Sequence, residues 1–238
     1  MSLIQLTEAL SDMEVVELGQ ILEQNMPVSP MGTPFYHLPH NRIELGDACT
    51  DYQLLMGEHA GTHVDAFRHI VAQTDYEWID EMPLSVFCGS CITIDASHVG
   101  PDGLLEKEGI QAWEAAHGPI SEGTAVLIDF DWMKRWRRKP DDGPFLFHHP
   151  AIGPSAAGYL AEKGVRIVGV DTKGVDSNGD RECPVHHILL GHRIPVIENL
   201  RNLPKIRNRQ GYLAVLPLLI RGGSASPIRP VVLVDRQN

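Results

Sequence analysis

The chain has 238 residues, of which 43% are hydrophobic and 21% are charged. This composition excludes a disordered or low-complexity chain and suits one large domain or two small ones. With 20 Lys and Arg against 31 Asp and Glu, the formal net charge is −11. An acidic chain binds phosphate backbones and anionic membrane surfaces poorly, so we expect neither nucleic acid nor a membrane as a partner.

The sequence carries no pattern typical of export or of membrane insertion. The longest apolar run covers residues 212–220, is too short to span a bilayer and contains Pro217. Acidic residues (Glu8, Asp12 and Glu14) interrupt the N-terminal segment, which argues against a secretory signal. Four cysteines are too few for a disulfide scaffold in a chain of this length. Together these features predict a reduced, cytoplasmic protein.

The first half of the chain alternates short apolar patterns with irregular segments. We expect a helix over residues 2–12 and a strand over 15–18. Residues 25–45 are rich in Pro and Gly, which favours irregular chain or edge structure. Further along, the pattern predicts a strand within residues 84–96, a helix over 105–117 and a strand over 124–130.

The clearest unit of the second half covers residues 150–171. Ser155 is the expected N-cap of a helix, Gly164 lies at its C-terminal end, and a strand follows over residues 165–170. We then expect a helix from Pro184 to Gly191 and strands over 194–200, 212–220 and 228–234. Because helical and strand periods alternate without a repeat or a long linker, the sequence predicts a mixed α/β fold.

Three of the 12 histidines gather in one short segment. His59, His63 and His69 fall within eleven residues, together with Asp65. Imidazole nitrogen and carboxylate oxygen are ligands that Zn²⁺ and Mn²⁺ accept. Gly61 allows the chain to bend, so that the side chains can converge from a turn into a strand. An isolated pair of histidines four residues apart binds metal in roughly one case in ten, but the added aspartate and third histidine favour a metal site.

A second set of ligand-type residues lies downstream. His186 and His187 fall in the first turn of a predicted helix, and Glu198 shares the strand phase of its apolar neighbours. A carboxylate buried there costs several kcal/mol unless it is paired or bound to a cation. A salt bridge to Arg193 or Arg201 is an equally good explanation of Glu198.

Residues 59–69 (HAGTHVDAFRH) resemble the His-x-Gly-Thr-His-x-Asp-x-Pro-x-His signature of the cyclase-like metal-dependent hydrolases. This family includes bacterial kynurenine formamidase (arylformamidase) and isatin hydrolase. The resemblance extends over roughly residues 15–234, with further similar segments at 79–84, 125–132, 160–176, 186–203 and 217–229.

The resemblance implies a single domain over residues 1–238, with a mixed, barrel-like β core flanked by helices, that forms a homodimer or homotetramer. It implies that His59, His63 and Asp65 hold one divalent ion, Zn²⁺ or Mn²⁺. Asp65 would bridge to a second ion held by His186 and Glu198. His69 would be the catalytic histidine.

Two departures from the family pattern fall beside the ligand-type residues. Phe67 stands where the family usually has Pro, and Lys173-Gly174 replaces the usual Pro-Ser after Asp171-Thr172. We expect these positions to affect the choice of substrate more than the chemistry.

The function implied is hydrolysis of an amide C–N bond, either in a formyl amide of an aromatic amine or in a cyclic amide. His69 would take a proton from water or give one to the leaving nitrogen. Two alternatives use the same residues: a metal-dependent lyase or dehydratase, and a non-catalytic metal-binding sensor.

Four aromatic residues are candidates for stacking on a planar substrate: Phe35, Tyr36, Phe67 and Trp132. Core packing or an oligomer contact explains them equally well.

Two further patterns have little predicted function. Cys88 and Cys91 form a Cys-x-x-Cys pair inside a strand-like run, where side chains three apart face opposite sides. We give a redox role roughly one chance in twenty. The basic residues between 134 and 139 are expected to be solvated.

Overall fold

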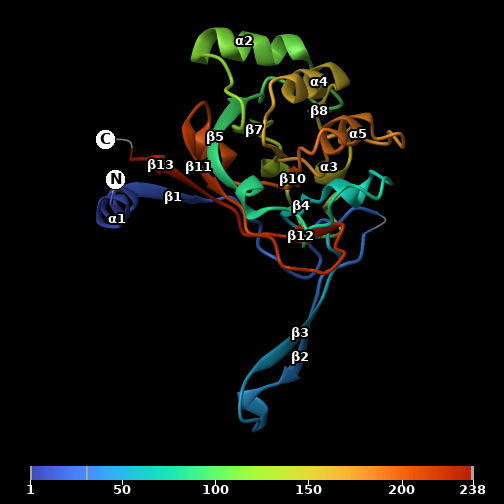
Figure 1. Ribbon diagram of the computed structural model, residues 1–238. Helices are drawn as coiled ribbons and strands as arrows, with labels where there is room; N and C mark the ends of the chain where they lie inside the picture. The colour runs from blue at the N-terminus through green and yellow to red at the C-terminus, as the bar shows by residue number, and fades with distance from the viewer. Residues whose placement is uncertain (1, 31, 237–238) are drawn as a thin grey trace.

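The computed structural model describes residues 2–30 and 32–236 and arranges them around a nine-stranded mixed sheet (Figure 1). The sheet curls into a half-barrel, which confirms the predicted class of a compact α/β domain with a barrel-like core. In spatial order its strands are β1 (Met13–Glu17), β13 (Val231–Asp235), β11 (Gln210–Ala214), β5 (Cys88–Asp95), β7 (Ala125–Asp129), β9 (Ile167–Val170), β10 (Val196–Glu198), β4 (His63–Asp65) and β12 (Ala225–Pro227).

The four central strands β5, β7, β9 and β10 run parallel, and the flanking strands pair antiparallel. Parallel strands are covered on both faces and therefore read as continuous apolar runs. In β7 all five residues are buried, including Val126, Leu127 and Ile128.

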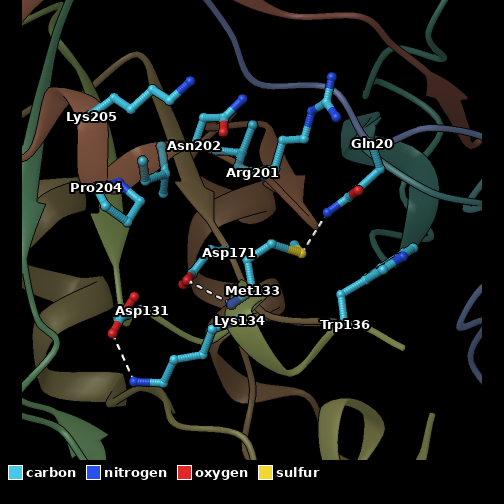
Figure 2. A pocket seen from close by; sticks show the side chains of 12 residues that line it. Gln20, Asp131, Met133, Lys134, Trp136, Asp171, Arg201, Asn202, Pro204 and Lys205 are labelled. Atoms are coloured by element: carbon cyan, nitrogen blue, oxygen red, sulfur yellow. Dashed lines mark hydrogen bonds and ion pairs between the residues drawn. The ribbon is translucent and has the colours of Figure 1, made fainter. Parts of the chain in front are cut away.

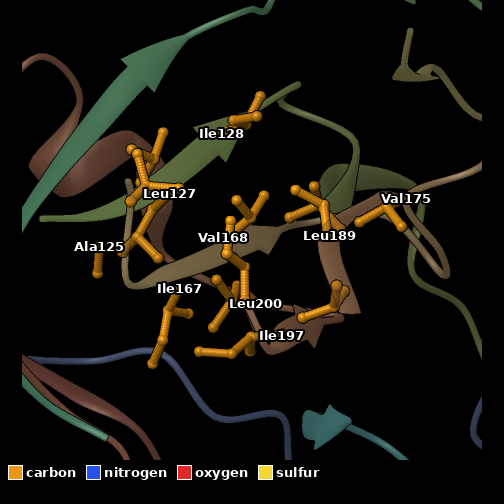
Figure 3. Packing of buried hydrophobic residues seen from close by; sticks show 14 of the residues in the cluster. Ala125, Leu127, Ile128, Ile167, Val168, Val175, Leu189, Ile197 and Leu200 are labelled. Carbon is orange, nitrogen blue, oxygen red and sulfur yellow. The ribbon is translucent and has the colours of Figure 1, made fainter. Parts of the chain in front are cut away.

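Helices cover the central strands. Figure 1 shows α2 (Lys107–His117), α4 (Pro154–Glu162) and α5 (Pro184–Gly191) together on one side of the molecule. Apolar side chains pack densely on both faces of the central strands, among them Leu127, Val168, Leu189 and Leu200 (Figure 3). Gly169 lies in this core, where an added Cβ would come within 2.8 Å of both Leu127 and Leu200. The close packing at Gly169 therefore leaves no room for a side chain at this position of β9.

The remaining elements are short. They are α1 (Leu3–Ser11), α3 (Gly143–Leu146), the parallel pair β6 (Leu104–Leu105) and β8 (Ala151–Ile152), and 3₁₀ turns at Ile43–Leu45, Phe67–His69, Leu84–Val86, Met133–Arg135 and Leu203–Ile206. None of the helices within residues 2–30 and 32–236 has the length and apolar character needed to cross a bilayer.

An antiparallel hairpin projects from the body of the protein. It is formed by β2 (Tyr36–Asn41) and β3 (Asp51–Leu55), and Figure 1 shows it extending well away from every other element. We call residues 36–55 the arm. Apart from the partly covered Asn41, every residue of its two strands is exposed.

Most predicted elements are confirmed, with two corrections. Residues 25–45, predicted as irregular chain or edge structure, contain β2, which has a strand neighbour on one side only. Gly153, not Ser155, is the N-cap of α4, because Pro154 begins the helix and the Ser155 hydroxyl instead donates to Glu106. The strand predicted over residues 212–220 ends at Ala214, and the short strand β12 was not predicted.

Candidate active site

Strand pairing brings the two ligand-type segments together. Strand β10 lies antiparallel to β4, and their register sets Glu198 opposite His63. Asp65 is two residues further along β4 and therefore faces the same side of the sheet. His186 reaches the same place from the first turn of α5. The residues predicted from two distant segments thus form one cluster.

Four side chains surround a common point. His63 Nε2 lies 3.3 Å from Glu198 Oε2 and 3.5 Å from Asp65 Oδ1. His186 Nε2 lies 3.2 Å from Glu198 Oε1 and 3.5 Å from Asp65 Oδ2. Ligand atoms on a tetrahedral ion with bonds of about 2.1 Å are about 3.4 Å apart. The spacing of these donors therefore fits a bound divalent ion.

The hydrogen bonds behind the two rings fix which nitrogen faces the cluster. His63 Nδ1 lies 3.0 Å from the Gly61 carbonyl oxygen, so this nitrogen carries the proton and donates it. His186 Nδ1 lies 2.5 Å from Asp176 Oδ2. Both Nε2 atoms are left to act as ligands, the arrangement in which a carbonyl or carboxylate orients a metal-binding histidine. Gly61 has φ of +66°, which confirms the predicted bend.

Three buried atoms of the cluster lie close to polar neighbours but make no well-aligned hydrogen bond. These are His63 Nε2 and both carboxylate oxygens of Asp65, which is 1% exposed. An unsatisfied buried carboxylate is costly unless a cation compensates it. The donor set, its spacing and its unsatisfied atoms therefore all fit a metal centre.

The electrostatics of the cluster follow from burial and opposite charge. Burial opposes the charged form of Glu198, but close contacts with the imidazoles of His186 and His63 outweigh it and lower the pKa of Glu198 to about 2. Burial also disfavours charge on His63, yet Glu198 and Asp65 raise its pKa to about 9. The carboxylates thus stabilise positive charge at this point. A metal cation can supply that charge in place of the protons on the imidazole rings.

His59 and His69 flank this cluster. His59 Nδ1 lies 2.9 Å from Asp65 Oδ1, and its ring centroid is 4.1 Å from that of His69. Ligand-type atoms of His59, Asp65 and His69 lie within 4.8 Å of one another, so Asp65 belongs to two groups that could hold an ion. His69 is exposed toward the cavity, and partial enclosure there lowers its pKa.

The cluster lines a cavity of about 420 Å³. His59, His63, His69, His186 and Glu198 all contribute to its wall. The described lining also includes apolar side chains (Pro27, Val28, Phe145 and Leu146) and polar ones (Ser29, His149, Lys173, Asp176, Ser177, Asp180, Cys183 and Asn199).

The four aromatic residues proposed to stack on a substrate are not among those lining this cavity. Phe67 and Trp132 are 2% and 3% exposed and pack in the main core. Phe35 is buried in a small cluster with Met26, and Tyr36 lies on the arm. Packing explains the buried three, because their large rings fill the interior around the cavity.

A second cavity of about 440 Å³ also contains basic residues (Figure 2). It differs from the cavity at the cluster in how its charged side chains are paired. Three of its charged side chains (Lys134, Asp171 and Arg201) already have partners. Lys134 Nζ lies 2.7 Å from Asp131, and Arg201 is 2.9 Å from Glu17. Asp171 accepts hydrogen bonds from backbone N–H groups, including that of Met133 (Figure 2). We interpret this cavity as structural.

Sequence reasoning missed several residues that contact the cluster. Asp176 orients His186, and Asn199 donates to the Gly61 carbonyl oxygen. Ser224 donates to Glu58, and its hydroxyl lies 3.2 Å from His59 Nε2. Asp176 could have been identified from its position in the loop after a buried strand, because site residues gather in such loops in parallel sheets. For Ser224 the sequence holds no comparable signal.

Residues 16–177 match the family model described as "Putative cyclase". Isatin hydrolase of Roseibium aggregatum is 30% identical, over 94% of this chain and 93% of that protein. Kynurenine formamidase of Bacillus cereus is 30% identical, over 92% of this chain and 97% of that protein. A crystal structure of an isatin hydrolase bound to the product analogue thioisatinate superposes with a TM-score of 0.90, at 28% identity and covering 99% and 100% of the two chains. The chain therefore belongs to the cyclase family of hydrolytic enzymes.

Proposed function

We propose that this protein is a metal-dependent hydrolase that cleaves the C–N bond of an aryl formamide or of a related cyclic amide. The observation that carries the proposal is the convergence of His63, Asp65, His186 and Glu198 on one point in the wall of a cavity that also contains His69. The names of the two relatives support an amide as substrate.

The residues of the cluster would hold Zn²⁺ or Mn²⁺, as one ion or as two sharing Asp65. Such an ion supplies polarisation of a carbonyl and activation of water. His69 has a lowered pKa and is therefore neutral near pH 7, so a ring nitrogen can take a proton from water. The same ring, once protonated, can give that proton to the leaving nitrogen, which departs poorly as an anion. The apolar wall would exclude water from the rest of the substrate.

The decisive assay incubates the protein with N-formylkynurenine and with isatin, after loading with Zn²⁺ or Mn²⁺ and after treatment with a chelator. We expect ring opening or formate release only from the loaded protein. Tight metal binding without turnover of either amide would instead favour the sensor, and elimination products would favour the lyase.

We also propose that the protein is a homo-oligomer in which the arm of one copy packs against the body of another. An isolated two-stranded hairpin is marginally stable in water, and the arm exposes apolar side chains such as Leu45 (75%) and Leu54 (63%). The body carries a groove of about 620 Å³ whose lining includes Ile21, Leu22, Leu216, Leu218 and Arg229. The arm has three acidic residues and one Arg. In the groove, Arg201 and Arg229 share the single carboxylate of Glu17, which leaves a net positive charge that complements the acidic arm.

A cytoplasmic location remains our proposal as well. Its support is that the four cysteines are free thiols, which suits a reducing compartment.

A further inference from the structure

The cavity contains a cation that neither the metal cluster nor the proposed chemistry uses. Lys173 lies three residues beyond the end of β9 and lines the cavity together with His186 and Glu198. It is the one Lys or Arg among the described residues of the lining. Its side chain is half-buried, and no carboxylate of residues 2–30 or 32–236 comes within 4.0 Å of its ammonium.

The loop that carries Lys173 is held rigidly beside the cluster. The buried Thr172 hydroxyl donates to the Gly174 carbonyl oxygen at 2.8 Å. The Thr172 carbonyl oxygen accepts the Asn199 N–H at 2.9 Å, which ties the loop to the end of β10. A Cβ on Gly174 would lie 3.5 Å from Glu198 Oε1. The ammonium therefore extends from a backbone segment that contacts the metal cluster.

A partly desolvated ammonium without an ion-pair partner is unfavourable, and a bound anion would relieve this cost. Burial lowers the pKa of Lys173, although attraction to Glu198 opposes the shift. The positive charge of Lys173 also contributes, after burial, to the lowered pKa of His149, which is 1% exposed in the same cavity wall.

Among the described side chains of the cavity lining, Lys173 is the one Lys or Arg that can attract an acidic ligand. Four carboxylates lie in or beside the lining: Asp65, Asp176, Asp180 and Glu198. Their negative charges would repel the carboxylate of a ligand. Pro27, Val28 and Leu146 contribute apolar groups to the same lining, and apolar groups of this kind suit an aromatic ring.

We propose that Lys173 binds the carboxylate of an anionic aryl amide and that the apolar wall contacts its ring. The inference rests on the proposed hydrolase function and narrows it to N-acylated aromatic amines that carry a carboxylate. The competing explanation is that Lys173 only offsets the charge of Glu198.

Binding tests the subsite without requiring turnover. Calorimetry would measure 2-aminobenzoate binding to the metal-loaded protein, to Lys173→Met, to Lys173→Arg and to Lys139→Met, which removes an exposed lysine outside the cavity. Equal metal content of the four proteins is checked by elemental analysis. We expect Lys173→Met to weaken binding at least tenfold, Lys173→Arg to restore most of it, and Lys139→Met to bind like the parent. Equal affinity in Lys173→Met, or no binding to the parent, would overturn the subsite.

Kinetics separates the subsite from the proposed reaction. The ratio of kcat/KM for 2-formamidobenzoate to that for formanilide, which lacks the carboxylate, should fall at least tenfold in Lys173→Met, mainly through KM. An equal loss for both amides would show that Lys173 acts through Glu198 and would overturn the proposal. If the parent cleaves neither amide but its binding depends on Lys173, the subsite stands and the hydrolase assignment fails. If the parent cleaves both amides but the affinity for 2-aminobenzoate does not depend on Lys173, the hydrolase assignment stands and the subsite fails.

Discussion

Glu198 and His63 face each other across neighbouring antiparallel strands, with Oε2 and Nε2 3.3 Å apart. The register of two strands that are distant in the sequence therefore sets the distance between these two candidate ligands. The Glu198→Gln substitution keeps the size of the side chain but removes the charge that attracts a cation. We expect at least a tenfold loss of Zn²⁺ affinity, measured by elemental analysis after dialysis against a graded chelator. Glu162→Gln, an exposed position at the end of α4, is the matched control. Full metal content in Glu198→Gln would remove Glu198 from the ligand set.

His69 should matter for turnover and not for metal content. If it acts as the proton-transfer group, His69→Ala retains the metal but loses about 10²–10⁴-fold in kcat. Its ligand-type atoms also lie close to those of Asp65 and His59, so the metal content of the variant is a real test. Loss of metal together with activity would make His69 a ligand, and unchanged turnover in the loaded variant would refute both roles.

Asp176 should act through His186. Because its carboxylate accepts from His186 Nδ1 at 2.5 Å, Asp176→Asn should loosen the ring and weaken metal binding about 10–100-fold. The chain offers a matched control in Asp102→Asn, which alters a comparable His–Asp contact with His148 on the surface. Both variants can be titrated with Zn²⁺ in the presence of a competing chromophoric chelator. Equal affinities would mean that Asp176 only anchors the start of α5.

Asp171 should make stability depend on pH. Burial and the nearby Asp129 carboxylate raise the pKa of Asp171 to about 7, although three backbone N–H groups oppose the shift. In the unfolded chain its pKa is about 4, so between pH 4 and 7 the folded protein binds more protons than the unfolded one. Its contribution to the free energy of unfolding therefore declines as pH rises through this window and levels off above it.

Urea unfolding in a chelator at pH 5 and pH 7.5 would measure this effect. We expect the decline between the two pH values to be about 1–3 kcal/mol smaller in Asp171→Asn than in the parent. The same variant should be less stable at both pH values, because the Asn side chain has a single acceptor oxygen for the N–H groups of Phe130, Trp132 and Met133. Parallel pH profiles would show that Asp171 is ionised throughout.

The arm should hold the oligomer together. Leu54→Asp places a charge on its exposed apolar surface and should convert the assembly to monomers at micromolar concentration, as measured by light scattering. Leu3→Asp introduces the same change at an exposed position on α1 and should leave the mass unchanged. A monomeric parent protein, or an unchanged mass in Leu54→Asp, would contradict the proposed contact.

Local patterns were sufficient to find the cluster. The spacing of His59, His63, Asp65 and His69 is a property of one short segment, and the resemblance of residues 186–203 to the family indicated the roles of His186 and Glu198. The strand phase of Glu198 independently indicated burial, and the structure places it at 7% exposure. Candidate ligands that follow the alternation of a strand can thus be predicted from the sequence.

Contacts that depend on tertiary packing could not be predicted from the sequence. Ser224 meets His59 only because β12 pairs with β4, a pairing that no local pattern encodes. The aromatic rings of Phe67 and Trp132 are of the type that stacks on a planar substrate. In the structure, however, both rings are buried and fill the core around the cavity. The prediction for β2 stayed open between irregular chain and edge structure, because its sequence, YHLPHN, lacks the alternation of a half-buried strand.

The position of β4 in the sheet has a consequence for biosynthesis. Its neighbours β10 and β12 come from beyond residue 195. A ribosome therefore releases the histidine-rich segment long before it makes the strands that hold that segment in place. The cluster is complete only after Glu198 has emerged, and a product that ends before β10 would carry His59, His63 and His69 without the strand that orders them.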